Sequence, residues 1–564
     1  MSTKRYTVTS ALLYANGPLH IGHIAGAYLP ADIYVRYLKA KGHDVAFICG
    51  SDEHGAAITL QAKKEGVSPK EIIDKYHSIN KKTFADFGIN FSIYHKTSEK
   101  LHHETAQNFF KVLEQNNVFT KKSTKEFYDD ENNLFLADRY ISGECPKCND
   151  ANAYGDQCEK CGSALSPEEL INPKSTLSGN TPIKKETSHW YLPMQNHEKW
   201  LKEWIEEGSL DGKNHHDPKA WKSQVLGQCK SWIDGGLQER AMTRDLDWGV
   251  KVPIKDAAGK VLYVWLDAPI GYISATKQWA ADNKKNWKDY WQNQDTELIH
   301  FIGKDNIVFH CIIFPIILKA HKDYILPTNV PANEFLNLEG KKLSTSRNWA
   351  IWLHEYLKDF KGQEDSLRYT LCASAPEGKD TDFTWINFQA RNNNELVAIF
   401  GNLINRVVVL THKYWGGIVP GQNNLTDYDQ EIIEKLANFP DKIGVSIEKF
   451  RFREAITELM NLARLGNKYL ADTEPWKLKS TEEERTETIL NIAIQIAASL
   501  AILSSPFMPF TSKKLTEILN LKNTSWNNAG KIVINKNHLI NKGSLLFEKI
   551  EDEKIAEQLE KLNS

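Results

Sequence analysis

The chain has 564 residues, of which 41% are hydrophobic and 25% charged, so it can bury large cores and should form about three or four domains. Its formal net charge of -2 at pH 7 excludes a basic coat for nucleic acid over the whole molecule but leaves room for a local basic face. No run approaches about 18 consecutive apolar residues, so we expect no membrane span. Eight cysteines in a chain of this length do not suggest a disulfide framework, and we expect a reducing, cytoplasmic setting.

The first fifty residues predict a βαβ unit. Residues 6–13 are rich in Thr, Val and Leu, and residues 45–49 form a short apolar run typical of a buried parallel strand. Residues 21–40 between them carry apolar side chains at helical spacing and predict a helix. Pro30 falls inside that helix, where a proline costs about 3 kcal/mol, so we expect a kink or a break there.

The strand pattern returns far downstream. Residues 260–266 predict a strand ending at Asp267-Ala268-Pro269, and residues 297–302 predict another ending at Gly303-Lys304-Asp305. An apolar helix is expected over residues 307–320, and long helical segments follow at 395–413 and 489–503. The sequence therefore predicts an α/β fold with a parallel sheet, split by an insertion at about 119–230 and followed by an all-α region.

The insertion contains the strongest single motif, Cys145-x2-Cys148-x9-Cys158-x2-Cys161. Two Cys-x-x-Cys knuckles so close together can supply four thiolates to a closed tetrahedral zinc site. A closed site leaves no open coordination position, so the metal would be structural. The alternative is four unrelated thiols, and the other cysteines are interpreted as buried core residues.

A phosphate-binding turn is predicted after the first strand, at Gly17, His20, Gly22 and His23. Ligands of open α/β sheets bind beyond the carboxyl ends of the strands, and a helix N-terminus there offers free N–H groups. Imidazole N–H donors can stabilise charge that grows on phosphoryl oxygens. Two histidines in a turn do not establish this role by themselves.

The segment Lys342-Leu343-Ser344-Thr345-Ser346 lies more than 300 residues downstream. Lysine supplies a cation and the hydroxyls supply neutral donors to phosphate. In isolation such a segment is more often a solvated loop. Together with the histidine turn it can hold a triphosphate from two sides, so ATP chemistry is the first hypothesis.

Polar residues at two further places have alternative interpretations. Asp52 ends the second predicted strand, where its carboxylate could bind a substrate ammonium group or cap a helix. Asn402 and Arg406 lie four residues apart on one helix face, and Trp476 follows Glu474-Pro475. These three could read unstacked RNA bases, or form a solvated face and a core tryptophan.

In this order the pieces resemble the class I aminoacyl-tRNA synthetases, whose paired motifs are called HIGH and KMSKS, and within them the methionyl-tRNA synthetases. The resemblance covers nearly the whole chain and rests on residues 9–17, the four cysteines, and residues 264–272, 301–305, 342–346 and 474–476. It implies a Rossmann-like nucleotide-binding domain and a helical-bundle anticodon-binding domain. It also implies an ATP-dependent ligase that forms methionyl-adenylate and transfers methionine to the terminal adenosine of tRNA(Met), with Mg²⁺ accompanying ATP and one structural zinc.

The resemblance also implies site residues. Those expected at ATP, with His20, His23, Lys342 and Thr345 as the catalytic set, are Tyr14, Asn16, Gly17, His20, Gly22, His23, Lys304, Lys342, Leu343, Ser344, Thr345 and Ser346. Those expected at methionine are Ala11, Leu12, Tyr14, Asp52, Arg244, Trp265, Ala268, Pro269, Tyr272, Asp305 and His310. Asn402, Arg406 and Trp476 match the anticodon-reading positions, and Cys145, Cys148, Cys158 and Cys161 match the zinc ligands.

The domain limits that this implies are 1–118 and 231–325 for the two halves of the catalytic domain and 119–230 for the zinc-bearing insertion. Residues 326–387 would form a stem-contact linker with the KMSKS loop, 388–540 the anticodon-binding domain and 541–564 a tail. We expect a monomer that meets no membrane.

Three positions depart from the family pattern. Thr345 replaces the second KMSKS lysine, so Lys341, Lys342 or Arg347 must carry more of the pyrophosphate interaction. Leu13 stands where proline is frequent, and Phe314 stands where a tryptophan often lines the pocket. Two alternatives remain: a related synthetase for Ile, Val, Leu or Cys, and a zinc-stabilised RNA-binding protein without catalysis. The insertion of about 110 residues is short for an editing domain, which disfavours the branched-chain enzymes.

Overall fold

The computed structural model describes residues 3–136, 138–155, 158, 160–161, 163, 165–345 and 347–563. Ser346, the last residue of the predicted phosphate loop, lies outside them. The centre of the molecule is a six-stranded sheet in the order β17-β16-β1-β3-β2, with β4 also paired to β3. All five pairings are parallel. The strands are β1 (Arg5–Ser10), β2 (Leu13–Tyr14), β3 (Asp44–Asp52), β4 (Ile93–Lys96), β16 (Thr296–Gly303) and β17 (Ala332–Asn333).

The helix predicted over residues 21–40 is confirmed, but Pro30 does not break it: the backbone stays helical, and the irregularity is a π-helical stretch just before the proline. The segment begins as α1 (Ile21–His23), continues as a π-helical stretch over Ile24–Tyr28 and becomes α2 (Leu29–Ala40). Pro30 stands in the first turn of α2, where a proline is tolerated because its missing N–H has no intrahelical partner to lose. The apolar helix expected over 307–320 shows the same pattern, since a π-helical stretch at Phe309–Ile313 precedes α10 (Phe314–His321).

The strand expected over residues 260–266 is wrong. Only β15 (Val261–Leu262) is extended, and it pairs with β14 (Thr243–Arg244) outside the central sheet. The rest belongs to α8 (Val264–Asp282), whose first twelve or so residues are mostly buried and which contains Pro269. A short apolar run gives no periodicity that separates a buried strand from a buried helix. Trp265, Ala268, Pro269 and Tyr272 therefore lie on a helix and not at a strand end.

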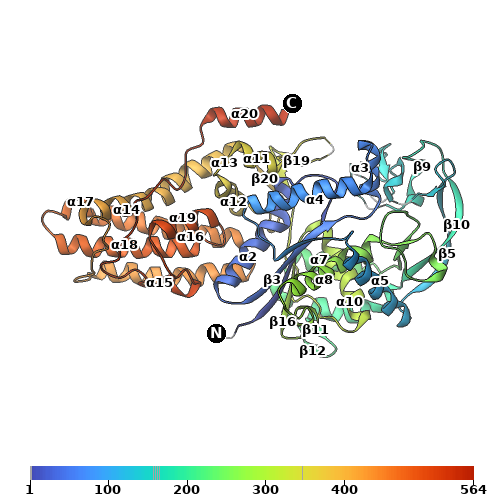
Figure 1. Cartoon of the computed structure of the whole chain (residues 1–564), viewed down its shortest axis with the longest axis horizontal. Helices are drawn as coiled ribbons and strands as arrows, with labels where there is room; N and C mark the ends of the chain where they lie inside the picture. The colour runs from blue at the N-terminus through green and yellow to red at the C-terminus, as the bar shows by residue number, and fades with distance from the viewer. Residues whose placement is uncertain are drawn as a thin grey trace.

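The insertion between the two halves of the central sheet forms separate small sheets (Figure 1). A four-stranded sheet has the order β13-β10-β5-β6 and is dominated by the antiparallel pair β5 (Thr120–Asp129) and β10 (Ile183–Leu192). Its other strands are β6 (Leu134–Phe135) and β13 (Arg240–Ala241), of which β13 comes after the limit of 230 expected for the insertion. A three-stranded sheet has the order β8 (Ala153–Tyr154), β7 (Ile141–Glu144) and β9 (Ile171–Ser175), and the first cysteine knuckle directly follows its middle strand.

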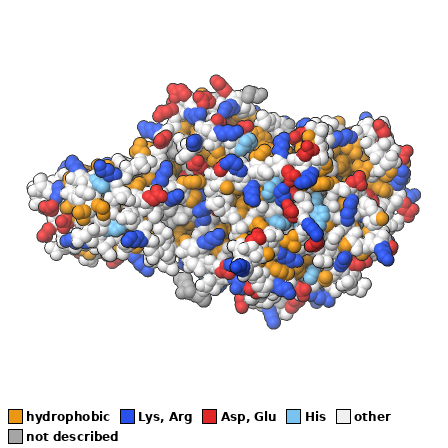
Figure 2. Space-filling view, viewed as in Figure 1, with side chains coloured by type: hydrophobic (Ala, Val, Ile, Leu, Met, Phe, Trp, Pro, Cys, Tyr) orange, Lys and Arg blue, Asp and Glu red, His pale blue; other side chains and the backbone are white. Residues whose placement is uncertain are grey.

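Long helices form the opposite end of the molecule, drawn in orange and red in Figure 1. They are α14 (Asn402–Trp415), α15 (Asp427–Glu448), α16 (Phe452–Thr473), α18 (Glu483–Leu503) and α19 (Pro509–Ile518). Asn392–Gly401, just before α14, is π-helical. Two helical segments, 385–415 and 483–503, are long and apolar enough to cross a membrane, but nearly all of the most apolar part of α18 is buried within the protein, as expected of a core helix. On the face shown in Figure 2, charges of both signs are interspersed.

A buried ion pair joins the central sheet to the helical end. Arg368 on α12 (Glu364–Ala373) donates to the Asp32 carboxylate on α2 at 2.6 Å, and both side chains are almost fully buried. The same guanidinium donates to the carbonyls of Phe507 at 2.9 Å and Pro506 at 3.2 Å, which precede α19. Arg36 also binds Asp32, at 2.7 Å. One arginine thus links three parts of the chain that are distant in sequence.

Replacing this arginine should destabilise the protein. In Arg368→Met the Asp32 carboxylate loses a buried partner and the two carbonyls lose their donor, so we expect a loss of about 3 kcal/mol or more in unfolding free energy. Arg451→Met, which removes a mostly exposed arginine 3.6 Å from Glu454, is the matched control and should change stability by less than about 1 kcal/mol. Urea unfolding measures both, and equal midpoints for the two variants would contradict the role of Arg368.

Candidate functional site

The two motifs predicted to hold phosphate lie against each other. The backbone N–H of Ile21 donates to the Ile351 carbonyl at 3.1 Å, and that of Leu353 donates to the Leu19 carbonyl at 2.9 Å. A Cβ atom added to Gly22 would lie 2.5 Å from the Leu343 side chain. A side chain at position 22 would therefore displace Leu343 of the lysine-serine loop, which packs directly on that backbone.

His20 and His23 form a stacked pair with ring centroids 3.6 Å apart. His20 Nδ1 accepts from the backbone N–H of Gly22 at 3.1 Å, and the backbone N–H of His20 donates to His23 Nδ1 at 3.3 Å. Burial lowers the pKa of His20 well below its ordinary value and that of His23 to about 4. Both rings are neutral at pH 7, and each carries its proton on Nε2, so each offers an uncharged N–H donor.

Asn80 holds the turn in front of these histidines. Its amide donates to the Gly17 carbonyl at 3.0 Å, and its Oδ1 accepts from the backbone N–H of Leu19 at 3.0 Å. Asn80 is buried on α4 (Pro69–Asp86), where nothing in the sequence pattern marks it, and it was not predicted. Tyr14 and Asn16, which were predicted, are exposed at the carboxyl end of β2.

A chain of hydrogen bonds connects three of the residues predicted at methionine: Leu12, Tyr272 and His310. The backbone N–H of Leu12 lies 3.3 Å from the Tyr272 hydroxyl, which lies 3.0 Å from His310 Nε2. His310 Nδ1 lies 3.1 Å from the Asn306 carbonyl, so Nδ1 carries the proton and Nε2 accepts from Tyr272. Burial lowers the pKa of His310 to about 4, which keeps the ring neutral. Through Tyr272, these bonds connect α8 to the segment that follows β1 and to the segment that follows β16.

Asp52 lies at the carboxyl end of β3 and is 4% exposed. Its carboxylate accepts a long bond of 3.4 Å from the backbone N–H of His54. Burial, followed by repulsion from Asp267, raises the pKa of Asp52 to about 7. A buried carboxylate with so few hydrogen-bond donors is stabilised when a cationic group binds beside it.

Asp267 beside it is fully partnered. Its two carboxylate oxygens bind His54 Nδ1 at 2.7 Å and His102 Nε2 at 2.6 Å, and all three side chains are buried. These three residues also form one of the two groups in the described chain with metal-binding potential. Their short contacts are those of a hydrogen-bonded His–Asp–His bridge, which satisfies Asp267 without an ion.

Trp265 and Arg244, predicted at the methionine site, belong to an aromatic stack. Trp265 and Tyr263 stack with centroids 6.0 Å apart, and the Arg244 guanidinium lies 3.9 Å from the centre of the Tyr263 ring. Arg240 lies 4.7 Å from the Trp265 ring and was not predicted. Ala268 and Pro269 are buried on α8, and Asp305 accepts from the Asn306 amide at 3.1 Å.

The two lysines of the predicted ATP site lie on different elements, Lys304 in a 3-10 turn directly after β16 and Lys342 on a strand. The Lys304 ammonium donates to Glu334 at 2.7 Å and Asp380 at 2.8 Å, so it is held by carboxylates. Lys342 on β19 (Lys341–Lys342) is exposed, as is Thr345. Ser344 pairs with Trp349 through two backbone hydrogen bonds of 3.0 and 2.9 Å, which close the loop.

The four cysteines come together as predicted. Sγ of Cys145 lies 3.8 Å from that of Cys161, and Sγ of Cys148 lies 3.6 Å from that of Cys158. All four ligand atoms lie within 4.8 Å of one another, so the cluster could hold a metal ion. None of the four is in a disulfide.

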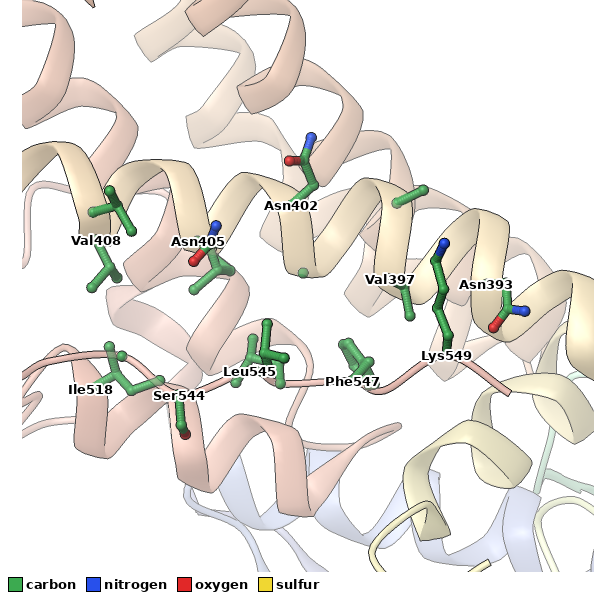
Figure 3. A pocket seen from close by; sticks show the side chains of 16 residues that line it. Asn393, Val397, Asn402, Asn405, Val408, Ile518, Ser544, Leu545, Phe547 and Lys549 are labelled. Atoms are coloured by element: carbon green, nitrogen blue, oxygen red, sulfur yellow. The ribbon is translucent and has the colours of Figure 1, made fainter. Parts of the chain in front are cut away.

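Arg406 and Trp476 meet at the far end of the helical region. The Arg406 guanidinium lies 5.8 Å from the Trp476 ring centre, and Trp476 is 39% exposed. Asn402, four residues before Arg406, donates to Asn467 at 3.4 Å. Asn402 also lines a cavity of about 460 Å³ between its helix and residues 543–549, shown in Figure 3. Trp476 is therefore a surface residue and not a core tryptophan.

Comparison with known proteins agrees with this geometry. A family model described as tRNA synthetases class I (M) matches residues 6–408, and one described as the anticodon binding domain of methionyl tRNA ligase matches residues 419–564. A methionine–tRNA ligase of Cytophaga hutchinsonii is 60% identical, covering 99% of this chain and 81% of the relative. One of Christiangramia forsetii is 59% identical, covering 100% and 81%.

A solved structure shares the fold. Methionyl-tRNA synthetase of Mycobacterium tuberculosis, in complex with methionyl-adenylate, superimposes with a TM-score of 0.79 at 20% sequence identity. The match covers 97% of this chain and 100% of that one. With two family models spanning most of its length and relatives near 60% identity, the chain belongs to the methionine–tRNA ligase family of class I tRNA synthetases.

Proposed function

We propose that this chain activates methionine with ATP, releasing pyrophosphate, and then transfers the methionyl group from the adenylate to the terminal adenosine of tRNA(Met). The observation that carries the proposal is the packing of Leu343 on Gly22, which brings the histidine turn and the lysine-serine loop together at the carboxyl edge of the sheet. The triphosphate would lie between them. The related ligases and the methionyl-adenylate bound to the mycobacterial enzyme support the same assignment.

His20 and His23 would stabilise charge and not transfer protons. Both are neutral with Nε2–H directed away from the backbone that they cap, and their stacking fixes both rings. Such donors are preorganised before charge develops on the phosphoryl oxygens. Lys342 and the hydroxyls of Ser344, Thr345 and Ser346 would approach from the other side, with Tyr14, Asn16 and Lys304 at the nucleotide. Mg²⁺, when bound with ATP, spreads charge over the phosphates.

Methionine would bind beside this site. Its ammonium would reach the Asp52 carboxylate, and Asp305 and Arg244 would lie near its polar end. Its thioether would meet the aromatic and apolar side chains of Ala11, Leu12, Tyr14, Trp265, Ala268, Pro269, Tyr272 and His310, which suits a soft, polarisable sulfur. Phe314 packs behind Tyr272, with ring centroids 6.3 Å apart, and would set the depth of the pocket.

The helical end would read the anticodon through Asn402, Arg406 and Trp476. An exposed tryptophan beside an arginine provides a stacking platform for unstacked bases. We retain the domain limits given above, a monomeric state, a cytoplasmic location and the absence of a membrane contact as parts of this proposal.

Zinc is the metal proposed for the cysteine cluster. Four thiolates at about 2.3 Å from a tetrahedral zinc are about 3.8 Å apart, close to the Sγ separations of 3.6 and 3.8 Å. A closed set of four ligands gives the ion a structural role. It would fix the two knuckles of an insertion that has only a small apolar core of its own.

Methionine-dependent exchange of labelled pyrophosphate into ATP tests the proposed activation directly. His23→Ala should slow this reaction about 10²–10³-fold with little change in methionine affinity, because the lost donor acts on transition-state charge. His43→Ala replaces a histidine at the opposite edge of the sheet and should leave the rate unchanged. Absence of exchange in the unaltered protein would refute the activity, while a change confined to methionine affinity would refute the phosphate role.

Methionine binding should depend on pH through Asp52. The free carboxyl has a pKa raised to about 7, whereas the ammonium of the ligand favours the ionised form, so binding should release up to one proton below pH 7. Affinity should rise as pH increases to about 7 and then level off. Asp52→Asn should remove this dependence and weaken binding by about 2–5 kcal/mol. Calorimetric titration at several pH values measures both, with exposed Asp86→Asn as the control; the same pH profile in Asp52→Asn would contradict the assignment.

Purified protein should contain one zinc per chain by elemental analysis. Cys145→Ser should lose the metal, whereas Cys372→Ser, which alters a buried cysteine outside the cluster, should retain it. Because the thiolates must be deprotonated to bind, the metal should also be released in acid. Fully folded, active protein without metal would exclude the structural zinc.

A further inference from the structure

The helical region has a second cleft, separate from the cavity shown in Figure 3. It has a volume of about 380 Å³ and lies between α12, the helix that contains Arg391, and α16. Three arginines line it: Arg391, Arg453 and Arg464. None of the proposed steps of methionine activation uses these residues.

The arginines have unused donors. Arg391 Nη1 lies 3.4 Å from Glu395, but its Nε is buried and has no hydrogen-bond partner within the described chain. Arg464 donates to the Asn461 amide oxygen at 3.0 Å, and Arg453 uses only its backbone N–H, toward Glu377 at 3.0 Å. Neither of these two guanidinium groups forms an ion pair with a described residue.

Three glutamates line the same cleft, and each already accepts hydrogen bonds. Glu395 accepts from the Tyr369 hydroxyl as well as from Arg391. Glu454 accepts from the Ser446 hydroxyl at 3.1 Å, and Glu458 accepts from the Asn461 amide at 3.1 Å. The carboxylates are thus occupied while most of the guanidinium donors are not, which favours an anion as the missing partner.

The cleft is connected to the Arg406–Trp476 site. Arg464 and Asn467 are three residues apart on one face of α16, and Asn467 contacts both the Ile399 carbonyl, at 2.8 Å, and Asn402. From Arg391 to Arg406 the helix rises roughly 22 Å at about 1.5 Å per residue. A nucleic-acid backbone that runs from the anticodon site along this helix toward Arg391 would pass the three arginines of the cleft.

We propose that Arg391, Arg453 and Arg464 bind the phosphodiester backbone of the same tRNA whose anticodon is read at Arg406 and Trp476. The inference rests on the proposed function, which supplies the RNA. A planar guanidinium can make two parallel hydrogen bonds to phosphate, and contacts of this kind position an RNA without reading its sequence. The cleft therefore sets how the tRNA lies between the anticodon site and the central sheet.

The test uses the full chain and a transcript of tRNA(Met), with binding measured by fluorescence anisotropy from 50 to 200 mM KCl. The double variant Arg453→Gln/Arg464→Gln should bind about tenfold or more weakly. Its plot of log affinity against log salt should be less steep by about 1–2, as expected for one or two lost phosphate contacts. Lys435→Gln, which removes an exposed charge on α15, is the matched control and should change neither quantity.

Three further readouts distinguish the possible failures. Methionine-dependent pyrophosphate exchange should be unchanged in the double variant, and its absence from the unaltered protein would refute the proposed function itself. For a transcript with an altered anticodon, the double variant should lose the same factor in affinity as for the normal transcript. Trp476→Ala, in contrast, should weaken binding of the normal transcript and leave binding of the altered one unchanged. An unchanged salt slope, with normal thermal stability, would overturn the phosphate site. If the double variant unfolds early, Arg453→Lys/Arg464→Lys replaces it, and that variant should restore the slope but not the full affinity.

Discussion

The buried contact between Arg368 and Asp32 is the constraint on which the rest of the arrangement depends. The proposed methionine site lies at the central sheet and the proposed anticodon site lies on the helical end, so the relative position of these two parts must be fixed. Arg368 satisfies that need from a single side chain, because it binds a carboxylate on α2 and two carbonyls ahead of α19. A buried ion pair adds little net stability over apolar packing, but it is costly to leave half-made, and that cost favours a single docking geometry.

Burial also determines the electrostatics of the active site. The same low-polarity surroundings that lower the pKa of His20 and His23 raise that of Asp52. The imidazoles are therefore neutral donors, and the Asp52 carboxyl holds its proton more readily than an exposed aspartate. Both effects follow from placing polar groups at the carboxyl ends of parallel strands that are covered by helices. The paired motifs are far apart in sequence, yet the fold brings them into contact, because Leu343 packs on Gly22 and the backbone of residues 19–21 is hydrogen-bonded to that of residues 351–353.

The sequence alone predicted those features that depend on the type and spacing of neighbouring residues. The four-cysteine cluster and the histidine turn were predicted because thiolate spacing and glycine next to a helix start are local constraints, and Pro30 marked the irregular part of the first helix for the same reason. The strand predicted over 260–266 failed because burial on all sides removes the periodicity that separates helix from strand. Asn80 and Arg240 were missed for a different reason: an amide that holds a turn and an arginine over a tryptophan ring are recognised only by their tertiary contacts, which no local pattern records.

The π-helical stretches show the same limit and indicate why it matters. Three of the four in the described residues occur at Ile24–Tyr28 directly after the histidine turn, at Phe309–Ile313 around His310, and at Asn392–Gly401 directly before Asn402. The fourth, Glu203–Glu207, lies in the insertion. A π-turn places one additional residue in each turn, so it rotates the residues that follow relative to a regular α-helix. In a continuous α-helix, residues eleven apart such as Arg391 and Asn402 would lie on nearly the same face. The π-helical stretch that follows Arg391 changes this relation, so that one continuous helix lines the arginine cleft with Arg391 and Glu395 and also carries Asn402 and Arg406. A single element would thereby serve both of the RNA contacts proposed above.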